Sequence, residues 1–441
     1  MRRRVGSICF SRVVNAGEFL YNEHMSVLAL DALLLFVLSV PVVMRYRILP
    51  IEGTPYWLFG ILFLILITNV LVSLYPGFFK KTIVLKAKLL FLMATLAIVV
   101  GGTTVTAIVD RSRTAPVYNV HDIILQQEAA MRYLLQGKNP YKETYFGTFL
   151  EEWHYAEGGK DAVNPALYHF VMPPWYLIFA FPFYFISTPV VGFFDGRMPL
   201  LFALTGLLFV IYRWLKDKNL ASAAVVLTAL SPATIDYFIE GRSDMFALFW
   251  LVWALYLLDK RKFIISSLLF GLAVLSKQTT WFMFPLYAVF GWLLLKRSIG
   301  KTILLFIPAL MALMIVAGPF LLWDAKAFID STVLYLSGNS VHSYPISGYG
   351  LGMLLYEAGV IKDMHAHYPF ILWQITLGLP VLGAVLWYLV KKPVMSRLLV
   401  GYGVVLLVFW YMSRYLNNSH VGFISSIFAL GVLKDWDEKT T

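Results

Sequence analysis

The segments that decide the fold are YWLFGILFLILITNVLVSLY (56–75) and TILLFIPALMALMIVAGPFLL (302–322). Neither contains a charged residue, and each is long enough to cross a hydrocarbon layer about 30 Å thick as a helix. Because lipid cannot satisfy backbone N–H and C=O groups, uncharged segments of this length must form helices. The alternating pattern of outer-membrane strands is absent. The sequence therefore predicts an all-α, multi-pass membrane protein.

The composition of the whole chain supports this prediction. Of 441 residues, 59% are hydrophobic and 14% are charged, whereas soluble domains average about 45–50% apolar and about 25% charged residues. Similar apolar runs along the chain predict a helix bundle of about 12 spans, within a range of about 11 to 13. Neither a linker nor a low-complexity tract nor a repeat interrupts residues 1–441, so we expect one integral domain. The single cysteine, Cys9, excludes an intramolecular disulfide.

The net charge of +11 indicates membrane orientation rather than nucleic-acid binding. The basic residues occur in short clusters between spans, as expected for cytoplasmic loops. These clusters are Lys80 to Lys88, Arg213 to Lys218, Lys260 to Lys262, Lys296 to Lys301 and Lys391 to Arg397. The loops expected on the non-cytoplasmic side are then 109–168, 233–243, 276–279, 324–367 and 413–420. We expect the active site on that side of the cell membrane.

Loops on opposite sides of the membrane must be joined by an odd number of crossings. Counting crossings between the basic clusters and the external loops therefore predicts that two apolar segments do not span. Segment 169–187 contains Pro173, Pro174 and Pro182, which interrupt a helical hydrogen-bond ladder, so we expect it along the surface. Segment 351–361 is too short to span. At the N-terminus, 26–44 is too long for a cleaved signal core and is expected to be a retained anchor. The start codon can be Met1 or Met25.

The long loop 109–168 carries 8 of the 25 acidic residues. Its segment VHDIILQQEAAMRYLLQGKNPY (120–141) has the apolar period of a helix, and Gly137 followed by Asn139-Pro140 is a helix stop. We expect this amphipathic helix to lie flat at the membrane surface, with Asp122 in its first turn. Acids are common there because they complement the helix dipole, so position alone assigns Asp122 no catalytic role.

Several of these residues resemble a known family. His121-Asp122, Gln127-Glu128-Ala129-Ala130 and Gly137-Lys138-Asn139-Pro140-Tyr141 are similar to the first external loop of the GT-C glycosyltransferases. The closest similarity is to glycosyltransferase family 87, the polyprenyl-phosphate-mannose-dependent mannosyltransferases. Met172-Pro173-Pro174-Trp175 resembles the proline-rich segment that follows this loop. The resemblance covers the loop, whereas the remaining spans are similar only in topology.

The resemblance implies a membrane glycosyltransferase with Asp122 as general base. The donor would be a polyprenyl-phosphate sugar, with mannose implied by the resemblance alone, and the acceptor a lipid, glycan or protein. A histidine in the late external loop is also implied, and His342 in YLSGNSVHSYPISGYG (335–350) is the candidate, with His365, His367 and His420 as competitors. The family-like loop residues expected to contact substrate are His121, Gln127, Asn139 and Tyr141.

A phosphate leaving group requires cations on the same side of the membrane. Arg242, Lys277 and Arg414 each provide the strong base of a short external loop, although cations also anchor span ends. His420 is a further candidate for substrate contact. We expect no cofactor, and the histidines lack the spacing of a metal site. Asp435-Trp436-Asp437 matches a nucleotide-sugar pattern but is expected to be a solvated tail, and Asp31 is expected at the interface or paired within the bundle.

Other functions remain open on this evidence. A multi-pass transporter would be expected to show interrupted helices and polar groups at mid-membrane, which are few here. A polysaccharide polymerase or ligase, or a non-catalytic relative, would share the fold and the loop. Phosphate-binding glycine loops and metalloprotease motifs are absent from the sequence.

Overall fold

The computed structural model describes residues 29–48, 53, 55–157 and 160–440. Cys9, Met1 and Met25 lie outside these residues. The described chain is predominantly helical, and its strands are two residues long. The first half contains α3 (Leu30–Tyr46), α4 (Tyr56–Leu74), η1 (Pro76–Phe78), α5 (Lys81–Leu96), η2 (Ala97–Gly102), α6 (Thr103–Arg113), α7 (Asp122–Leu135), β1 (Ala156–Glu157), β2 (Lys160–Asp161), η3 (Pro165–Leu167), α8 (Pro174–Ile178), α9 (Phe181–Val191), α10 (Arg197–Trp214) and α11 (Lys218–Leu230).

The second half continues this helical pattern. It contains α12 (Ile235–Glu240), α13 (Asp244–Asp259), α14 (Phe263–Val274), η4 (Gln278–Met283), α15 (Phe284–Leu294), α16 (Ile299–Leu305), α17 (Ile307–Val316), α18 (Gly318–Ile329), η5 (Asp330–Leu334), α19 (Tyr335–Ser337), β3 (Ser347–Gly348), α20 (Leu351–Glu357), α21 (Phe370–Trp373), η6 (Gln374–Gly378), α22 (Leu379–Lys391), α23 (Met395–Tyr411), β4 (Tyr415–Leu416) and α24 (Asn418–Thr440). Strands β1 and β2 pair antiparallel, whereas β3 and β4 pair parallel.

Six helical segments of the described chain are long and apolar enough to cross a membrane. They are Tyr56–Leu74, Lys81–Arg113, Pro174–Val191, Arg197–Trp214, Ile299–Val316 and Phe370–Lys391. This confirms the coarse prediction of an all-α membrane bundle. A count near 12 would also require shorter helices such as α11, α14 and α23, and it stays a prediction.

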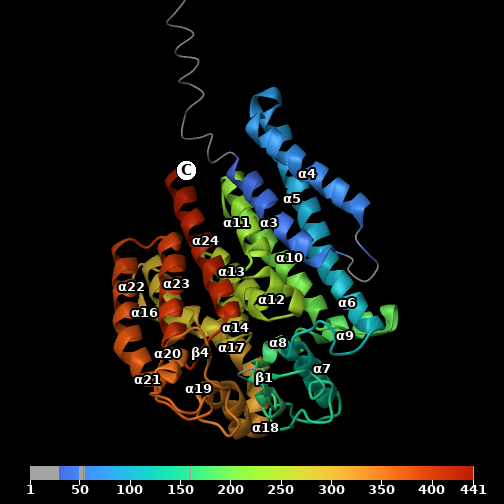
Figure 1. Cartoon of the computed structure of the whole chain (residues 1–441). Coiled ribbons are helices and arrows are strands. Elements are labelled where there is room, and N and C mark those ends of the chain that lie inside the picture. The colour runs from blue at the N-terminus through green and yellow to red at the C-terminus, as the bar shows by residue number, and fades with distance from the viewer. Residues whose placement is uncertain (1–28, 49–52, 54, 158–159, 441) are drawn as a thin grey trace, which may run out of the picture.

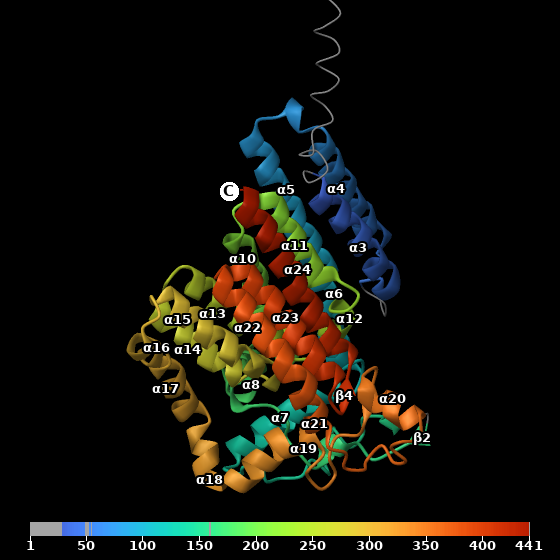
Figure 2. The same ribbon diagram turned by 90° about the vertical axis from the view of Figure 1, so that its left-hand side faces the viewer.

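The loops gather at two opposite ends of the bundle (Figures 1 and 2). The C-terminus and the connection between α4 and α5 lie at the upper end in both views, whereas α7, α18 and α19 lie at the lower end. At the upper end, Asp437 accepts backbone N–H bonds from Lys216 and Asp217 at 2.8 and 2.9 Å. The expectation of a fully solvated Asp435–Asp437 tail is therefore wrong, because Asp437 is buried and helps to close that end.

Lys88 was expected in a basic loop, and the structure corrects this. It lies within α5 and is buried, with its Nζ 2.8 Å from Asp31 Oδ1. A lysine in an apolar bundle needs such a partner because an unpaired buried charge is costly. Asp31 is thus paired within the bundle, which was one of its two expected positions.

The proline-rich segment forms two short helices, α8 and α9. Pro174 starts α8, and Pro182 lies in the first turn of α9. Proline is tolerated at these positions because the first-turn N–H groups have no partner within the helix. Pro174–Val191 is long and apolar enough to span, but α8 and α9 are separated by a turn at residues 179–180. The prediction that 169–187 does not span therefore stays a prediction. In 351–361, the seven-residue α20 packs near Ile346 and Ile361, which fits a segment too short to span.

Candidate functional site

An open cleft of about 620 Å³ lies at the lower end of the bundle. Its walls come from every loop expected on the non-cytoplasmic side. They are formed by parts of segments 121–126, 153–157, 164–172, 237–244, 277–278, 335–349 and 415–420, together with Met364. Loops separated by up to 300 residues in the sequence therefore converge on one site, and this convergence makes the cleft the candidate functional site.

Helix α7 places Asp122 at the edge of this cleft. Asp122 is the first helical residue, and His121 is the N-cap. The carboxylate is 18% exposed, with Oδ1 2.7 Å from His121 Nδ1, and Asn164 Nδ2 donates to Oδ2 at 3.1 Å. Burial raises the pKa of Asp122, but the His121 charge and hydrogen bond, the Asn164 amide and Arg242 outweigh burial and lower this pKa to about 2. Asp122 is thus ionised at neutral pH.

The same helix is more deeply buried than the sequence predicts. Its bounds and the Gly137 stop, with φ +72°, are confirmed. However, every residue from Ile124 to Met131 is buried, so α7 does not lie flat with an exposed polar face. The buried Gln126 donates to the carbonyls of Ala166 and His169 at 2.6 and 2.7 Å. A polar side chain of α7 therefore binds the backbone of the loop that follows the helix.

Two cations line the cleft. Arg242 lies 4.6 Å from the Tyr237 ring, and its Nε is 3.6 Å from Glu240 Oε2 without a hydrogen bond. Lys277 Nζ bonds Asp244 Oδ1 at 2.7 Å, while Asp244 Oδ2 is buried without a partner. Arg242 thus has only a long ion pair with Glu240, whereas Lys277 forms a short ion pair with Asp244. Both side chains are placed where an anion in the cleft can reach them.

Aromatic and amide side chains make up much of the remaining wall. Trp153 donates its Nε1–H to the Val120 carbonyl at 2.8 Å, which fixes the indole beside the His121 ring. Asn417 donates to the hydroxyl of Tyr344 at 3.2 Å. His420 also lines the cleft, and its Nδ1 accepts the Asn417 N–H at 3.2 Å. Planar apolar faces edged by hydrogen-bonding groups suit a sugar, which has apolar C–H faces and a rim of hydroxyls.

Three loop residues expected to contact substrate serve the fold of the loop instead. Gln127 is buried and donates to the Tyr176 carbonyl at 2.7 Å. Asn139 Oδ1 accepts the Tyr141 N–H at 3.1 Å, forming the turn after α7. Tyr141 is buried against Phe328 and donates to the Met172 carbonyl at 2.9 Å. None of the three lines the cleft, so the structure gives each a role in the fold of the loop and does not bring it to the candidate site.

His342 and Arg414 are also placed differently from expectation. His342 is exposed and stacks on Tyr168, with ring centroids 3.7 Å apart, and does not line the cleft. The Arg414 guanidinium donates to the carbonyls of Tyr344, Ala366 and Met364. Arg414 thus holds the backbone of its loop with three of its five N–H groups. Of the ten predicted residues, the cleft unites His121, Asp122, Arg242, Lys277 and His420.

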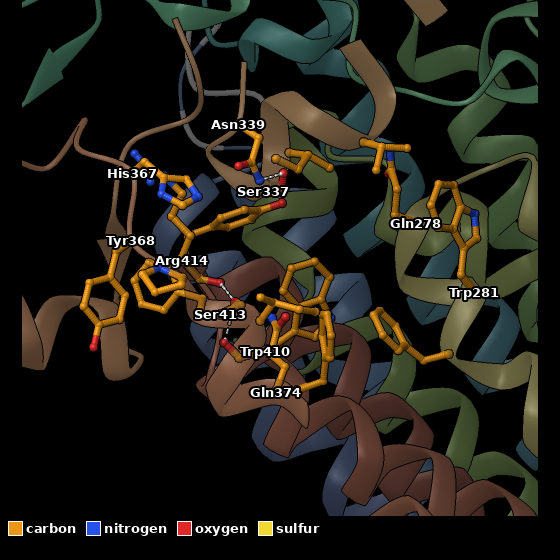
Figure 3. Close-up of a pocket in the computed structure, with 18 of the residues that line it drawn as sticks. Gln278, Trp281, Ser337, Asn339, His367, Tyr368, Gln374, Trp410, Ser413 and Arg414 are labelled. Atoms are coloured by element: carbon orange, nitrogen blue, oxygen red, sulfur yellow. Dashed lines mark hydrogen bonds between the residues drawn. The ribbon is translucent and has the colours of Figure 1, made fainter. Parts of the chain in front are cut away.

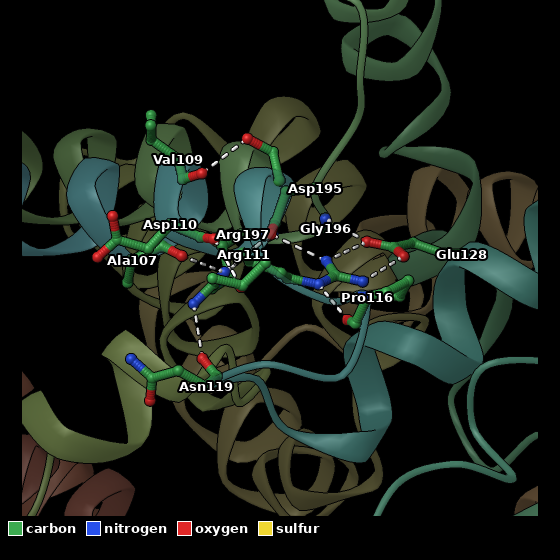
Figure 4. Close-up of polar contacts among 12 residues, drawn as sticks. Ala107, Val109, Asp110, Arg111, Pro116, Asn119, Glu128, Asp195, Gly196 and Arg197 are labelled. Carbon is green, nitrogen blue, oxygen red and sulfur yellow. Dashed lines mark hydrogen bonds and ion pairs between the residues drawn. The ribbon is translucent and has the colours of Figure 1, made fainter. Parts of the chain in front are cut away.

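A buried ionic network fixes the segment that carries His121 and Asp122 (Figure 4). Arg111 binds both carboxylate oxygens of Glu128 at 2.8 Å and Asp195 at 2.9 Å. Arg197, fully buried, binds Asp195 and donates to the Asn119 carbonyl at 3.0 Å. The network therefore joins α6, α7 and α10 to the turn residue Asn119, which lies just before the site. Bidentate pairs of this kind restrict geometry strongly.

An apolar groove lies next to the cleft (Figure 3). Its volume is about 390 Å³, and Gln278, Leu336 and Tyr415 line both the groove and the cleft. Trp281, Phe370 and Trp410 belong to its predominantly apolar wall. The site thus combines a polar, charged compartment with an adjoining apolar one.

Sequence reasoning missed Asn164 and Asp244. Asp244 lies two residues after Arg242 in the sequence. A carboxylate so close to a candidate phosphate ligand was the available signal. Asn164 precedes Pro165 and caps η3, so the sequence suggests only a turn residue. Its contact with Asp122 across 42 residues had no local signal.

The described residues contain no group of three or more His, Cys, Asp or Glu side chains arranged to hold a metal ion. The chain matches no protein-family model, and no match exists among the curated proteins or the solved structures. The resemblance of loop 109–168 to the GT-C enzymes thus stays a prediction from the sequence.

Proposed function

We propose that the protein is a GT-C-type membrane glycosyltransferase that moves a sugar from a polyprenyl-phosphate donor to an acceptor hydroxyl. The observation that supports this most is the junction of the two compartments. A cleft with a carboxylate and two cations opens beside an apolar groove that shares three lining residues with it. This layout suits a substrate with a polar head and a long apolar tail.

Each part of such a donor has a complementary wall. The phosphate would bind between Arg242 and Lys277, because phosphate oxygens prefer charge-assisted donors. The sugar would lie against the cleft's aromatic side chains, and the first isoprene units would enter the groove near Trp281 and Trp410. Mannose, a total near 12 spans and a non-cytoplasmic site belong to the same proposal, with mannose supported only by the resemblance of the loop.

The reaction requires a proton acceptor and a stabilised leaving group. An acceptor hydroxyl attacks the anomeric carbon as the bond from that carbon to the phosphate oxygen breaks. The Asp122–His121 pair takes the hydroxyl proton, and Arg242 and Lys277 stabilise the charge that develops on the departing phosphate. General-base catalysis contributes about 10²–10⁴-fold to rate.

The test measures sugar transfer in membranes supplied with a radiolabelled polyprenyl-phosphate sugar. Asp122→Asn should lose at least about 100-fold in rate while remaining folded. Asp161→Asn is the matched control, because Asp161 lies on the same loop with a 90% exposed side chain, and it should retain activity. Full activity of Asp122→Asn would exclude the catalytic assignment. Solute flux into vesicles without any transfer product would favour a transporter.

A further inference from the structure

Two neighbouring groups in the cleft are able to take up the acceptor's proton, and their geometry distinguishes them. We propose that Nε2 of His121 is the atom that receives the proton, and that Asp122 holds the imidazole in position for this step. The inference rests on the proposed transferase function. It assigns a catalytic role to a residue that the sequence indicated only as a substrate contact.

The first argument is the occupancy of the carboxylate. Oδ1 of Asp122 is 2.7 Å from His121 Nδ1, and Oδ2 accepts from Asn164. A nitrogen and a carboxylate oxygen this close require a shared proton, so Nδ1 is the donor. The Ile123 N–H, 3.3 Å from Nδ1, is then a weak contact. Both carboxylate oxygens are thus engaged, and an acceptor hydroxyl would have to displace one of these donors.

The second argument is the freedom of the other ring nitrogen. With Nδ1 protonated, Nε2 of a neutral imidazole carries a lone pair, and it has no hydrogen-bond partner among the described residues. The ring lines the cleft and is 22% exposed. The backbone N–H of His121 donates to the Glu240 carbonyl at 2.8 Å, which holds the backbone in place. The imidazole ring packs beside Trp153, with ring centroids 5.9 Å apart.

The third argument is basicity. A general base works best when its pKa is near the working pH. The pKa of Asp122 is lowered to about 2, which makes its carboxylate a weak proton acceptor. The charged side chains that line the cleft with the ring are Asp122, Glu157, Arg242, Asp244 and Lys277, and Glu240 lies beside Arg242.

The step is balanced in atoms and charge. The acceptor O–H proton moves to Nε2 while the oxygen forms a bond to the anomeric carbon. The bond between that carbon and the phosphate oxygen breaks, and its electron pair leaves with the polyprenyl phosphate. Asp122 remains ionised and stabilises the imidazolium, which then releases its proton to water. Asp122 is therefore a positioning residue in this scheme.

His121→Asn provides the decisive variant. Asparagine is a good N-cap and can donate an amide N–H to Asp122, but it cannot accept a proton at neutral pH. We expect its kcat to fall at least about 100-fold with little change in the KM for the donor. A variant that retains more than a tenth of the wild-type kcat would overturn the proposal and leave Asp122 as the base.

A second measurement reads the His121 titration without using activity. Diethyl pyrocarbonate modifies unprotonated imidazole nitrogens, and cleavage after Arg113 and Arg132 yields peptide 114–132, whose sole histidine is His121. The pH midpoint for modification of this peptide should coincide with the acid limb of kcat. Constant kcat through that midpoint would overturn the proposal while the transferase function stands. If the wild-type protein transfers no sugar from any polyprenyl phosphate, the proposed function and this inference both fail.

Discussion

At the scale of single residues, the site depends on which polar groups already have partners. Arg242 and Arg414 illustrate this, since both are arginines in loops at the same end of the bundle. The Arg242 side chain is 24% exposed, and its Nε lacks a hydrogen bond. The Arg414 guanidinium instead donates to three backbone carbonyls. The partly exposed Arg242 can therefore reach a phosphate in the cleft, whereas Arg414 is 2% exposed and holds loop backbone.

The two arginines should therefore respond differently to the same substitution. Arg242→Gln should raise the KM for a polyprenyl-phosphate donor about tenfold or more, because one charged hydrogen bond is worth about 1.5–3 kcal/mol, with little change in unfolding temperature. Arg414→Gln should lower stability by at least about 2 kcal/mol, because buried carbonyls lose their donors. Donor titrations and thermal unfolding in detergent measure both effects. An unchanged KM in Arg242→Gln would argue against the phosphate assignment.

These two residues also show the reach of sequence reasoning. A cation in an external loop predicts proximity to the site, and Arg242 and Lys277 do line the cleft. Whether a side chain points at substrate or at backbone depends on loops distant in sequence. Arg414, for example, bonds carbonyls about 50 residues away along the chain. Nothing in the local pattern separates these two outcomes.

At the scale of elements, α7 is positioned by buried charge as well as by apolar packing. Glu128 on α7 forms a two-pronged pair with Arg111 at the end of α6, and both side chains are less than 10% exposed. The Gly196 N–H also donates to Glu128 Oε1 at 3.1 Å. The sequence predicted the helix and its stop, because period and capping are local signals. It did not predict the burial of α7, because Arg111 and Asp195 contact this region from distant segments.

Removing Arg111 should accordingly destabilise the protein. Arg111→Met leaves Glu128 and Asp195 buried without that partner, and breaking a buried pair typically costs about 3–5 kcal/mol. Arg132→Met is the matched control, since Arg132 lies on α7 but is exposed, and it should change stability by less than about 1 kcal/mol. Unfolding in detergent compares the two. Equal stabilities would show that packing alone holds α7 in place.

At the scale of the whole molecule, loop charge predicted which loops meet. The cleft is lined by the loops that the positive-inside pattern assigned to one side, and the oppositely assigned loops contact one another around Asp437 and Ser396. Charge and apolar length suffice for this because they act on whole segments. Whether Pro174–Val191 crosses the membrane stays a prediction, because its length permits a span while the alternation of loop charge predicts that 169–187 does not span.

The arrangement of the two ends makes a prediction about the membrane. Tyr349 lines the cleft and is 68% exposed. Phe78 is 82% exposed and belongs to the connection between α4 and α5, which lies at the opposite end of the bundle (Figure 2). In a Cys9→Ser background, which contains no other cysteine, an impermeant maleimide added to intact cells should label Tyr349→Cys. It should label Phe78→Cys only after permeabilisation. The reverse pattern would place the cleft on the cytoplasmic side. A soluble nucleotide sugar could reach the cleft there. The proposal of a polyprenyl-phosphate donor would then have to be replaced.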